Sequence, residues 1–229
     1  MIKHCFWVLV GLTLVGQCHL NTVVAEDAKA DDKATVAKNL KWVSLFDGKT
    51  TKGWHPRGKV TRLEAVDGEL RLLSKTNVWV TTDAKRANFV LEAEVKIPQG
   101  ATSRFNSGLA FRCIGAKGKP KGYQCEIDGG NPGKDGGLYG IGLGGWLYPA
   151  RKTDKEYLSR IKPALKHGQW NRYRVHCEGP RIRIYVNAAL ITDVEHQGSL
   201  SGYFGIQHHG HGGEVRFRNL RVADLDKGK

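Results

Sequence analysis

Apolar and polar side chains alternate one by one along several stretches of the chain, whereas helical spacing is scarce. The pattern covers residues 89–97, 172–177, 181–186 and 214–218. Alternation of this kind puts apolar side chains on one face of a β-strand and polar side chains on the other. Short strands separated by glycine-rich turns predict an all-β fold, a jelly-roll sandwich of two antiparallel sheets with about five to seven strands each.

Turn signals support this prediction. Asp67-Gly68 separates the apolar stretches 63–66 and 70–73, which predicts a tight hairpin. Residues 154–165 are the one stretch expected to form a helical turn, and Pro163 is expected to end it.

The N-terminus reads as a secretory signal peptide over residues 1–25. A short basic start at Lys3 precedes the apolar run 5–16, and Val23-Val24-Ala25 fits a small-residue cleavage site. The run is shorter than the roughly 20 residues of a membrane span, so no span is expected. The alternative, a lipoprotein with its lipid on Cys18, conflicts with Gln17, because that cleavage favours a small residue. We therefore expect a secreted or periplasmic protein.

Two further segments follow the signal peptide. Residues 26–40 consist mainly of Ala, Asp, Lys and Thr, which is typical of a flexible linker. Residues 41–226 have the size of one domain and are long enough to bury a hydrophobic core.

The chain is strongly basic, with 36 Lys and Arg against 22 Asp and Glu, a net charge of +14. Loss of Lys3 with the signal peptide leaves +13. Such a charge favours anionic partners. Export argues against nucleic acid and for an acidic polysaccharide or an anionic envelope surface. Alternatively, the charges simply solvate the outward strand positions.

Three cysteines remain after the signal peptide: Cys113, Cys125 and Cys177. Cys113 and Cys125 flank the turn-rich stretch 115–122, so a disulfide across a hairpin is one alternative in an oxidising compartment. Three buried thiols are the other. No Cys-x-x-Cys pair exists, so a structural zinc site is not expected.

Two stretches carry polar side chains on the face opposite their apolar ones. In 122–128 the apolar side chains of Tyr123, Cys125 and Ile127 share one face, and 203–210 is built similarly. A face of carboxylate, amide and imidazole groups has no packing purpose, so it predicts a ligand site. Its members are Gln124, Glu126, Asp128, Gln207 and His209.

A third strand, around residues 106–113, adds to this face. Asn106, Gly108, Ala110 and Arg112 are expected on one side, where the small residues leave space above the sheet. Arg112 could then donate two hydrogen bonds to a sugar or carboxylate oxygen. Alternatively, it neutralises Glu126 or Asp128.

Two aromatic residues near glycines, Tyr139 and Trp146, are candidates for stacking on a sugar ring, with core packing as the alternative. The segment His208-His209-Gly210-His211 suggests a metal, but adjacent strand residues point to opposite faces, and a zinc enzyme needs about three ligands. No metal ligand is assigned. A divalent cation held by His209 with a carboxylate remains an open alternative, and the cofactor is unassigned.

A retaining glucanase needs two carboxylates about 5 Å apart. Glu126-Ile127-Asp128 is followed by Gly-Gly-Asn and lacks the second Glu, which argues against that mechanism.

The chain resembles the 3-keto-disaccharide hydrolase family, described also as 3-keto-glucoside 1,2-lyase/hydratase domains with a concanavalin A-like fold. The matching segments, in order, are 42–49 with Gly53-Trp54, 106–112, 122–127, 137–139, 169–173, 205–210 and 215–220. The chain departs from the family pattern after Glu126, at His208 and at Asn187-Ala188.

The resemblance implies cleavage of 3-keto glycosides. The ketone acidifies the hydrogen on C2, a base removes it, the C1 substituent is expelled, and water adds back. Glu126 or His209 is the expected base, and Asp128 orients the set. The expected substrate-binding residues are Asn106, Arg112, Gln124, Tyr139, Trp146 and Gln207. A non-catalytic, lectin-like carbohydrate-binding module and a structural envelope protein are the alternatives.

Overall fold

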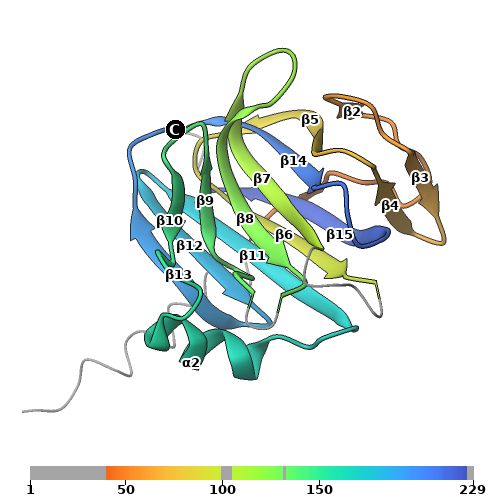
Figure 1. Ribbon diagram of the computed structural model, residues 1–229. Coiled ribbons are helices and arrows are strands. Elements are labelled where there is room, and N and C mark those ends of the chain that lie inside the picture. Colours follow the sequence, from red (N-terminus) through yellow and green to blue (C-terminus); the bar gives the residue numbers. More distant parts are fainter. Residues whose placement is uncertain (1–39, 99–104, 131–132, 226–229) are drawn as a thin grey trace, which may run out of the picture. The chain divides into compact units, whose positions relative to one another are not determined.

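The computed structural model describes residues 40–98, 105–130 and 133–225 (Figure 1). The expected signal peptide, its Cys18 alternative and all of the expected linker but Leu40 lie outside the described residues, and their boundaries stay predictions. Within the described part, no helix is long and apolar enough to cross a membrane.

Two antiparallel sheets pack face to face, which confirms the predicted jelly-roll sandwich (Figure 1). Within the described residues, sheet A has eight strands, one more than expected, and sheet B has seven. The order in sheet A is β13 (Ala189–Glu195), β12 (Arg181–Val186), β11 (Trp170–Glu178), β6 (Phe89–Lys96), β15 (Val215–Asp224), β4 (Glu69–Leu73) and β3 (Arg62–Val66), with β1 (Trp42–Ser44) paired to β15. The order in sheet B is β10 (Gly145–Tyr148), β9 (Leu138–Ile141), β8 (Lys121–Asp128), β7 (Asn106–Ile114), β14 (Gly202–His208), β5 (Val78–Arg86) and β2 (Trp54–Pro56).

The hydrophobic core lies between the sheets and uses the apolar face of each alternating strand. Tyr123, Cys125 and Ile127 of β8 are buried there, as the pattern predicts. Across the interface, the rings of Phe89 in sheet A and Phe204 in sheet B meet edge to face with centroids 4.9 Å apart. The predicted hairpin is present as β3–β4, and Asp67 takes a positive φ of 53° in its turn.

The one described helix, α2, spans Lys155–Ala164 and lies next to β13. Asp154 caps it by accepting a hydrogen bond from the Tyr157 backbone N–H at 2.8 Å. The expectation that Pro163 ends the helix is off by one residue. Pro163 lies inside the last turn, and the helix continues through Ala164. The backbone N–H of Leu165 still donates to the Ile161 carbonyl at 2.9 Å.

Strand β7 contains a bulge that overturns the predicted placement of Arg112. The register with β8 shifts between Phe111 and Ile114, and Arg112 takes a positive φ of 49°. An extra residue reverses the alternation of faces beyond it. Arg112 is consequently fully buried, and its Nε and Nη2 donate to the Ala87 carbonyl at 2.9 and 2.6 Å. It therefore lies apart from Asn106 and pairs with neither Glu126 nor Asp128.

The predicted alternative of a Cys113–Cys125 disulfide is wrong. All three described cysteines are free and buried, and burial raises the pKa of each thiol. Cys125 belongs to the core between the sheets, whereas the bulge turns Cys113 to the opposite face of sheet B. The two thiols therefore face different sides of the sheet, and the buried-thiol alternative holds.

Candidate functional site

Strand pairing brings polar side chains from four strands onto the outward face of sheet B. Trp79 of β5 is opposite Gln207 of β14, Gln207 is opposite Gly108 of β7, and Gly108 is opposite Glu126 of β8. Gln124 lies two residues before Glu126 on the same face. We call the following residues the amide cluster: Asn77, Trp79, Asn106, Gln124, Glu126 and Gln207.

Gln124 is the centre of the hydrogen bonds in the amide cluster. Its Oε1 accepts from the Trp79 indole N–H at 3.0 Å. Its Nε2 donates to Glu126 Oε2 at 3.0 Å and to Gln207 Oε1 at 3.2 Å. Gln207 donates in turn to Asn77 Oδ1 at 2.8 Å, and the Asn106 amide donates to Glu126 Oε1. The network fixes the orientation of the Gln124 and Gln207 amides, because the oxygen and the nitrogen of each have defined partners.

Gly108 makes this arrangement possible, but it does not leave the open space that the sequence suggested. A Cβ at this position would lie 2.4 Å from Cδ of Gln124, so the Gln124 side chain crosses the sheet directly above the glycine. The floor cleared by Gly108 is thus filled by a protein amide, which binds Glu126 from above the β7 backbone.

We therefore expect Gly108→Ala to push Gln124 out of place and to lower stability by about 1–3 kcal/mol, the usual cost of overpacking. Thermal unfolding measures this, and near-ultraviolet circular dichroism of the buried Trp79 reports the lost hydrogen bond. Gly58→Ala is the control, because its added carbon would meet Val78 at an ordinary 3.4 Å. Equal melting temperatures for both variants would show that Gln124 does not depend on Gly108.

Glu126 is the most unusual titratable group of this face. It is 2% exposed, and burial raises its pKa to about 8, because a buried carboxylate loses its hydration. The hydrogen bonds from Gln124 and Asn106 act in the opposite direction, and the charges of Asp128 and Asp135 raise the pKa further. Near neutral pH, Glu126 therefore exists in both protonation states, which suits a group that takes up and releases protons.

Asp128 and Asp135 hold the loop that follows β8. The two Asp128 carboxylate oxygens accept from the backbone N–H groups of Gly130 and Lys134 at 2.8 and 3.1 Å. Asp135 accepts from the Asp128 backbone N–H at 3.0 Å and from the Tyr173 hydroxyl at 2.9 Å. The structure thus places Asp128 where it acts on Glu126 through its charge, while its oxygens bind its own loop.

That loop delivers Lys134 to the site. Its ammonium lies 3.7 Å from the ring centroid of Trp146, and the charges of Glu126 and Asp128 act on its pKa. Burial lowers the pKa of Lys134 below its usual value, and the charges of Glu126 and Asp128 partly offset this by raising it. Tyr139 stands opposite Gln124 and contacts Trp146 edge to face, with centroids 5.3 Å apart. At 38% exposure, Trp146 is available for stacking, so the core-packing alternative does not describe it.

His209 lies at the end of the same face. Its backbone N–H donates to the Asn106 carbonyl at 3.0 Å, which continues the β14–β7 pairing by one residue. Partial desolvation and the neighbouring His211 lower the pKa of His209 below its usual value, although the residue is exposed. Its imidazole is therefore neutral at pH 7. Adjacent His208 points the other way and is buried, bonded to the Gly213 carbonyl at 2.7 Å.

The structure thus gathers most of the predicted site residues on one face and removes Arg112 from it. Among the described residues, no group of three or more His, Cys, Asp and Glu side chains could hold a metal ion. Sequence reasoning missed Asn77, Trp79 and Lys134. Trp79 lies in the wholly buried run Val78–Thr82, where alternation carries no signal. A lone Lys in a glycine-rich loop offers no signal either.

No curated protein resembles the chain closely enough to count as a relative. Two crystal structures of candidate glycosyl hydrolases from Parabacteroides distasonis ATCC 8503 share the fold. One has a TM-score of 0.59 at 19% identity, covering 89% of this chain and 99% of that chain. The other has a TM-score of 0.57 at 22% identity, covering 81% and 100%.

The carbohydrate-binding module CBM66 from Bacillus subtilis is also similar, with a TM-score of 0.53 at 17% identity, covering 75% of this chain and 96% of that chain. At these identities the likeness concerns the fold alone. A match in sequence goes further, because it extends over residues 41–223, most of the chain. The chain belongs to the family of 3-keto-alpha-glucoside-1,2-lyase-like domains, which is a carbohydrate-related family.

Proposed function

We propose that this protein cleaves 3-keto glycosides at the amide cluster, by removal of the C2 hydrogen, loss of the C1 substituent and addition of water. The observation that carries the proposal is Glu126, a buried carboxyl group whose pKa is raised to about 8 in the middle of a face of fixed amides. A group that titrates near neutral pH is suited to act as a general base.

In the first step, Glu126 takes the proton from C2, and the electron pair of the C–H bond moves into the ketone to give an enolate. The enolate then expels the oxygen on C1, which takes its proton from the protonated Glu126, so that Glu126 returns to the carboxylate form. A carboxylate has about four acceptor positions, so the amide hydrogen bonds to Glu126 leave acceptor capacity for this proton. The Lys134 ammonium supplies the positive charge that favours the enolate and the leaving oxygen.

In the second step, water adds its hydroxyl to C1 of the unsaturated ketone, and the proton of that water is delivered to C2. His209 is exposed and neutral at pH 7, so it can accept the proton of the attacking water. Tyr139 and Trp146 provide flat surfaces beside the amide cluster, on which the apolar face of a sugar ring can stack.

The pH dependence separates Glu126 from His209 as the first base. A base must be unprotonated, so with Glu126 in that role kcat/KM rises with pH until it levels off above about pH 8. With His209 in that role, kcat/KM would already be level above the usual histidine pKa, since the pKa of His209 is lowered. Initial rates on a 3-keto glucoside between pH 5 and 9.5 measure the profile. The Glu126 assignment fails if the rate is flat from pH 7 upward.

One observation favours the alternative of a non-catalytic carbohydrate-binding module. Both oxygens of Glu126 already accept amide hydrogen bonds, and the residue is almost wholly buried. In a binding module these groups would only bind sugar hydroxyls. Isothermal titration with a 3-keto glucoside and its unoxidised parent distinguishes the two. Tight binding of both sugars without product would favour the binding module.

We also propose that the protein is exported, to the periplasm or the exterior, on the basis of the leader-like residues 1–25. N-terminal sequencing of protein recovered from the exporting cell tests this. A mature chain that begins at Glu26 supports export through this leader, and retention of Met1 contradicts it.

A further inference from the structure

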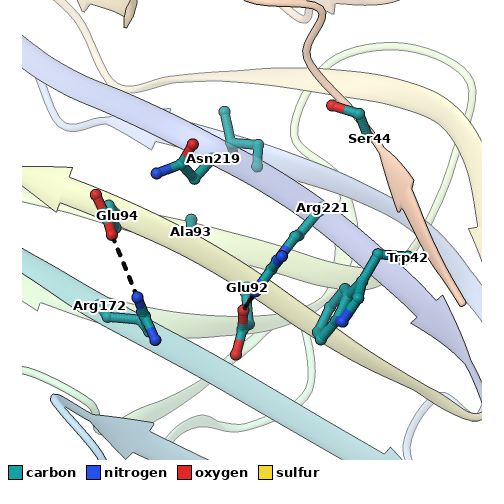
Figure 2. Close-up of a pocket in the computed structure, with 9 residues that line it drawn as sticks. Trp42, Ser44, Glu92, Ala93, Glu94, Arg172, Asn219 and Arg221 are labelled. Carbon is teal, nitrogen blue, oxygen red and sulfur yellow. Dashed lines mark hydrogen bonds and ion pairs between the residues drawn. The ribbon is translucent and has the colours of Figure 1, made fainter. Parts of the chain in front are cut away.

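Sheet A contains a hollow of about 410 Å³ on its outward face, on the opposite side of the core from the amide cluster (Figure 2). This volume is within the range of small-molecule sites. Strands β1, β6, β11 and β15 contribute its walls. Its lining includes Trp42, Glu92, Glu94, Arg172, Asn219 and Arg221.

A bulge in β15 accompanies the hollow. Arg218 is opposite Glu94 and Arg221 is opposite Glu92, so β15 advances by three residues where β6 advances by two. Asn219 takes a positive φ of 53°, which is uncommon for a residue other than glycine. Leu220 turns into the core, and Asn219 remains on the outward side at the edge of the hollow (Figure 2). Bulges of this kind often lie beside binding sites.

Positive charges outnumber negative charges around the hollow. Glu92 lies between Arg174 and Arg221, with ion-pair distances of 2.6 Å on both sides. Glu94 lies between Arg218 at 2.6 Å and Arg172 at 3.6 Å. Each carboxylate thus faces two guanidinium groups, and because Arg does not deprotonate in proteins, the surplus positive charge is permanent.

Arg172 is the guanidinium whose hydrogen bonds are unused. Its side chain is 56% exposed, and the 3.6 Å ion pair with Glu94 is too long for a hydrogen bond. Within the described ranges, that guanidinium donates no hydrogen bond. In Figure 2 it points from β11 toward Glu94. An Arg fork that is oriented by one carboxylate, but not saturated by it, matches a second carboxylate presented by a ligand.

Other groups around the hollow suit a ligand with hydroxyls. Asn219 and Glu94 add an amide and a carboxylate to the lining that Arg172 shares. Trp42 offers a flat wall, with the Arg221 guanidinium 4.3 Å from its ring centroid, so the ring is held in place. The combination of one unsaturated Arg, hydroxyl-binding groups and an indole fits a sugar that bears a carboxylate.

We propose that this hollow is a second binding site, which takes an acidic sugar of the uronic acid class through Arg172. The site is separate from the amide cluster, because the hydrophobic core lies between the two outward faces. In this proposal, part of the surplus positive charge of the chain binds an acidic ligand, and the remainder keeps the surface solvated.

Titration calorimetry of the full chain at low salt, with sodium glucuronate as the probe, tests this proposal. Glucose lacks the carboxylate and acetate lacks the hydroxyls, so both are expected to bind at least tenfold more weakly. Polygalacturonate distinguishes a polymer from a free sugar as the source of the ligand: a tighter Kd per uronate than for glucuronate indicates the polymer, and an equal Kd indicates the free sugar. Either result supports an acidic-sugar site.

The decisive variant is Arg172→Gln, which we expect to weaken glucuronate binding at least tenfold. Arg181→Gln is the matched control. It removes the same charge from the same sheet, at an exposed ion pair with Asp193, and should change the Kd by less than twofold. If both variants weaken glucuronate binding equally, net charge alone accounts for the binding, and the proposal is overturned. Glucuronate binding no tighter than acetate, or displacement of glucuronate by a DNA oligonucleotide that binds more tightly, would also overturn it.

Discussion

Glu126→Gln is expected to lower the turnover of a 3-keto glucoside by about 10³-fold, within the 10²- to 10⁴-fold contribution of a general base. Glutamine keeps the size and one acceptor oxygen of the side chain but cannot take up a proton from C2. Asn106 can turn its amide to face the new donor, so the amide cluster can persist. Initial rates at pH 8 measure the effect, and Glu64→Gln on sheet A is the control.

The stability of Glu126→Gln provides the check on folding. The pKa of Glu126 is raised in the folded protein from 4.5 to about 8, so the folded state holds a proton that the unfolded state releases. Glu126 therefore makes the wild type lose stability as the pH rises from about 4.5 through 8, by an amount on the order of a few kcal/mol, and the variant lacks this contribution. We expect the variant to be the more stable protein at pH 9. Undiminished turnover by this stable variant would remove Glu126 from the mechanism.

Asp135→Ala is expected to destabilise the protein by about 3–5 kcal/mol, the range for breaking a buried polar network. Asp135 lies where both sheets and α2 meet. Its carboxyl accepts from Tyr173 of sheet A and from the Asp128 backbone N–H in sheet B, and its carbonyl accepts from the Tyr157 hydroxyl of α2 at 2.9 Å. Alanine leaves the buried Tyr173 hydroxyl and the half-buried Asp128 N–H without this partner, at a cost of about 1–3 kcal/mol for a buried donor.

Urea unfolding at pH 6 measures this loss, with Asp135→Asn as the control. Burial raises the pKa of Asp135 to about 7, so at pH 6 the wild-type carboxyl is mostly protonated and the asparagine amide resembles it. The asparagine variant should lose less than half as much stability as the alanine variant. Because Asp135 adjoins Lys134, we also expect Asp135→Ala to weaken sugar binding. Equal losses in both variants would show that the hydrogen bonds of this carboxyl contribute little.

The sequence predicted those parts of the site that follow strict alternation. Gln124 and Glu126 lie where period two places them, because β8 runs without irregularity from Lys121 to Asp128. Arg112 could not be placed in this way, because a bulge shifts the register by one residue and reverses every later side chain. Nothing in the residues around Phe111 signals the bulge, which becomes visible only in the pairing with β8.

Pairing between strands that are distant in the sequence explains the other features that were not predicted. Trp79 joins the amide cluster because β5 pairs with β14, and the apolar run around it gives no sign of which face is polar. The hollow on sheet A depends on a bulge in β15 and on Arg–Glu–Arg contacts across three strands. The sequence shows the surplus of basic residues but not which guanidinium keeps free donors.

The central claim, that the amide cluster removes the C2 hydrogen of an oxidised sugar, is tested most directly in deuterated water. The purified chain is incubated with a 3-keto glucoside and with its unoxidised parent, and the released sugar is analysed by mass spectrometry. The account predicts cleavage of the 3-keto glucoside alone, with one deuterium at C2 of the product beyond the no-enzyme control. Release from both sugars, or release without added deuterium, would contradict it.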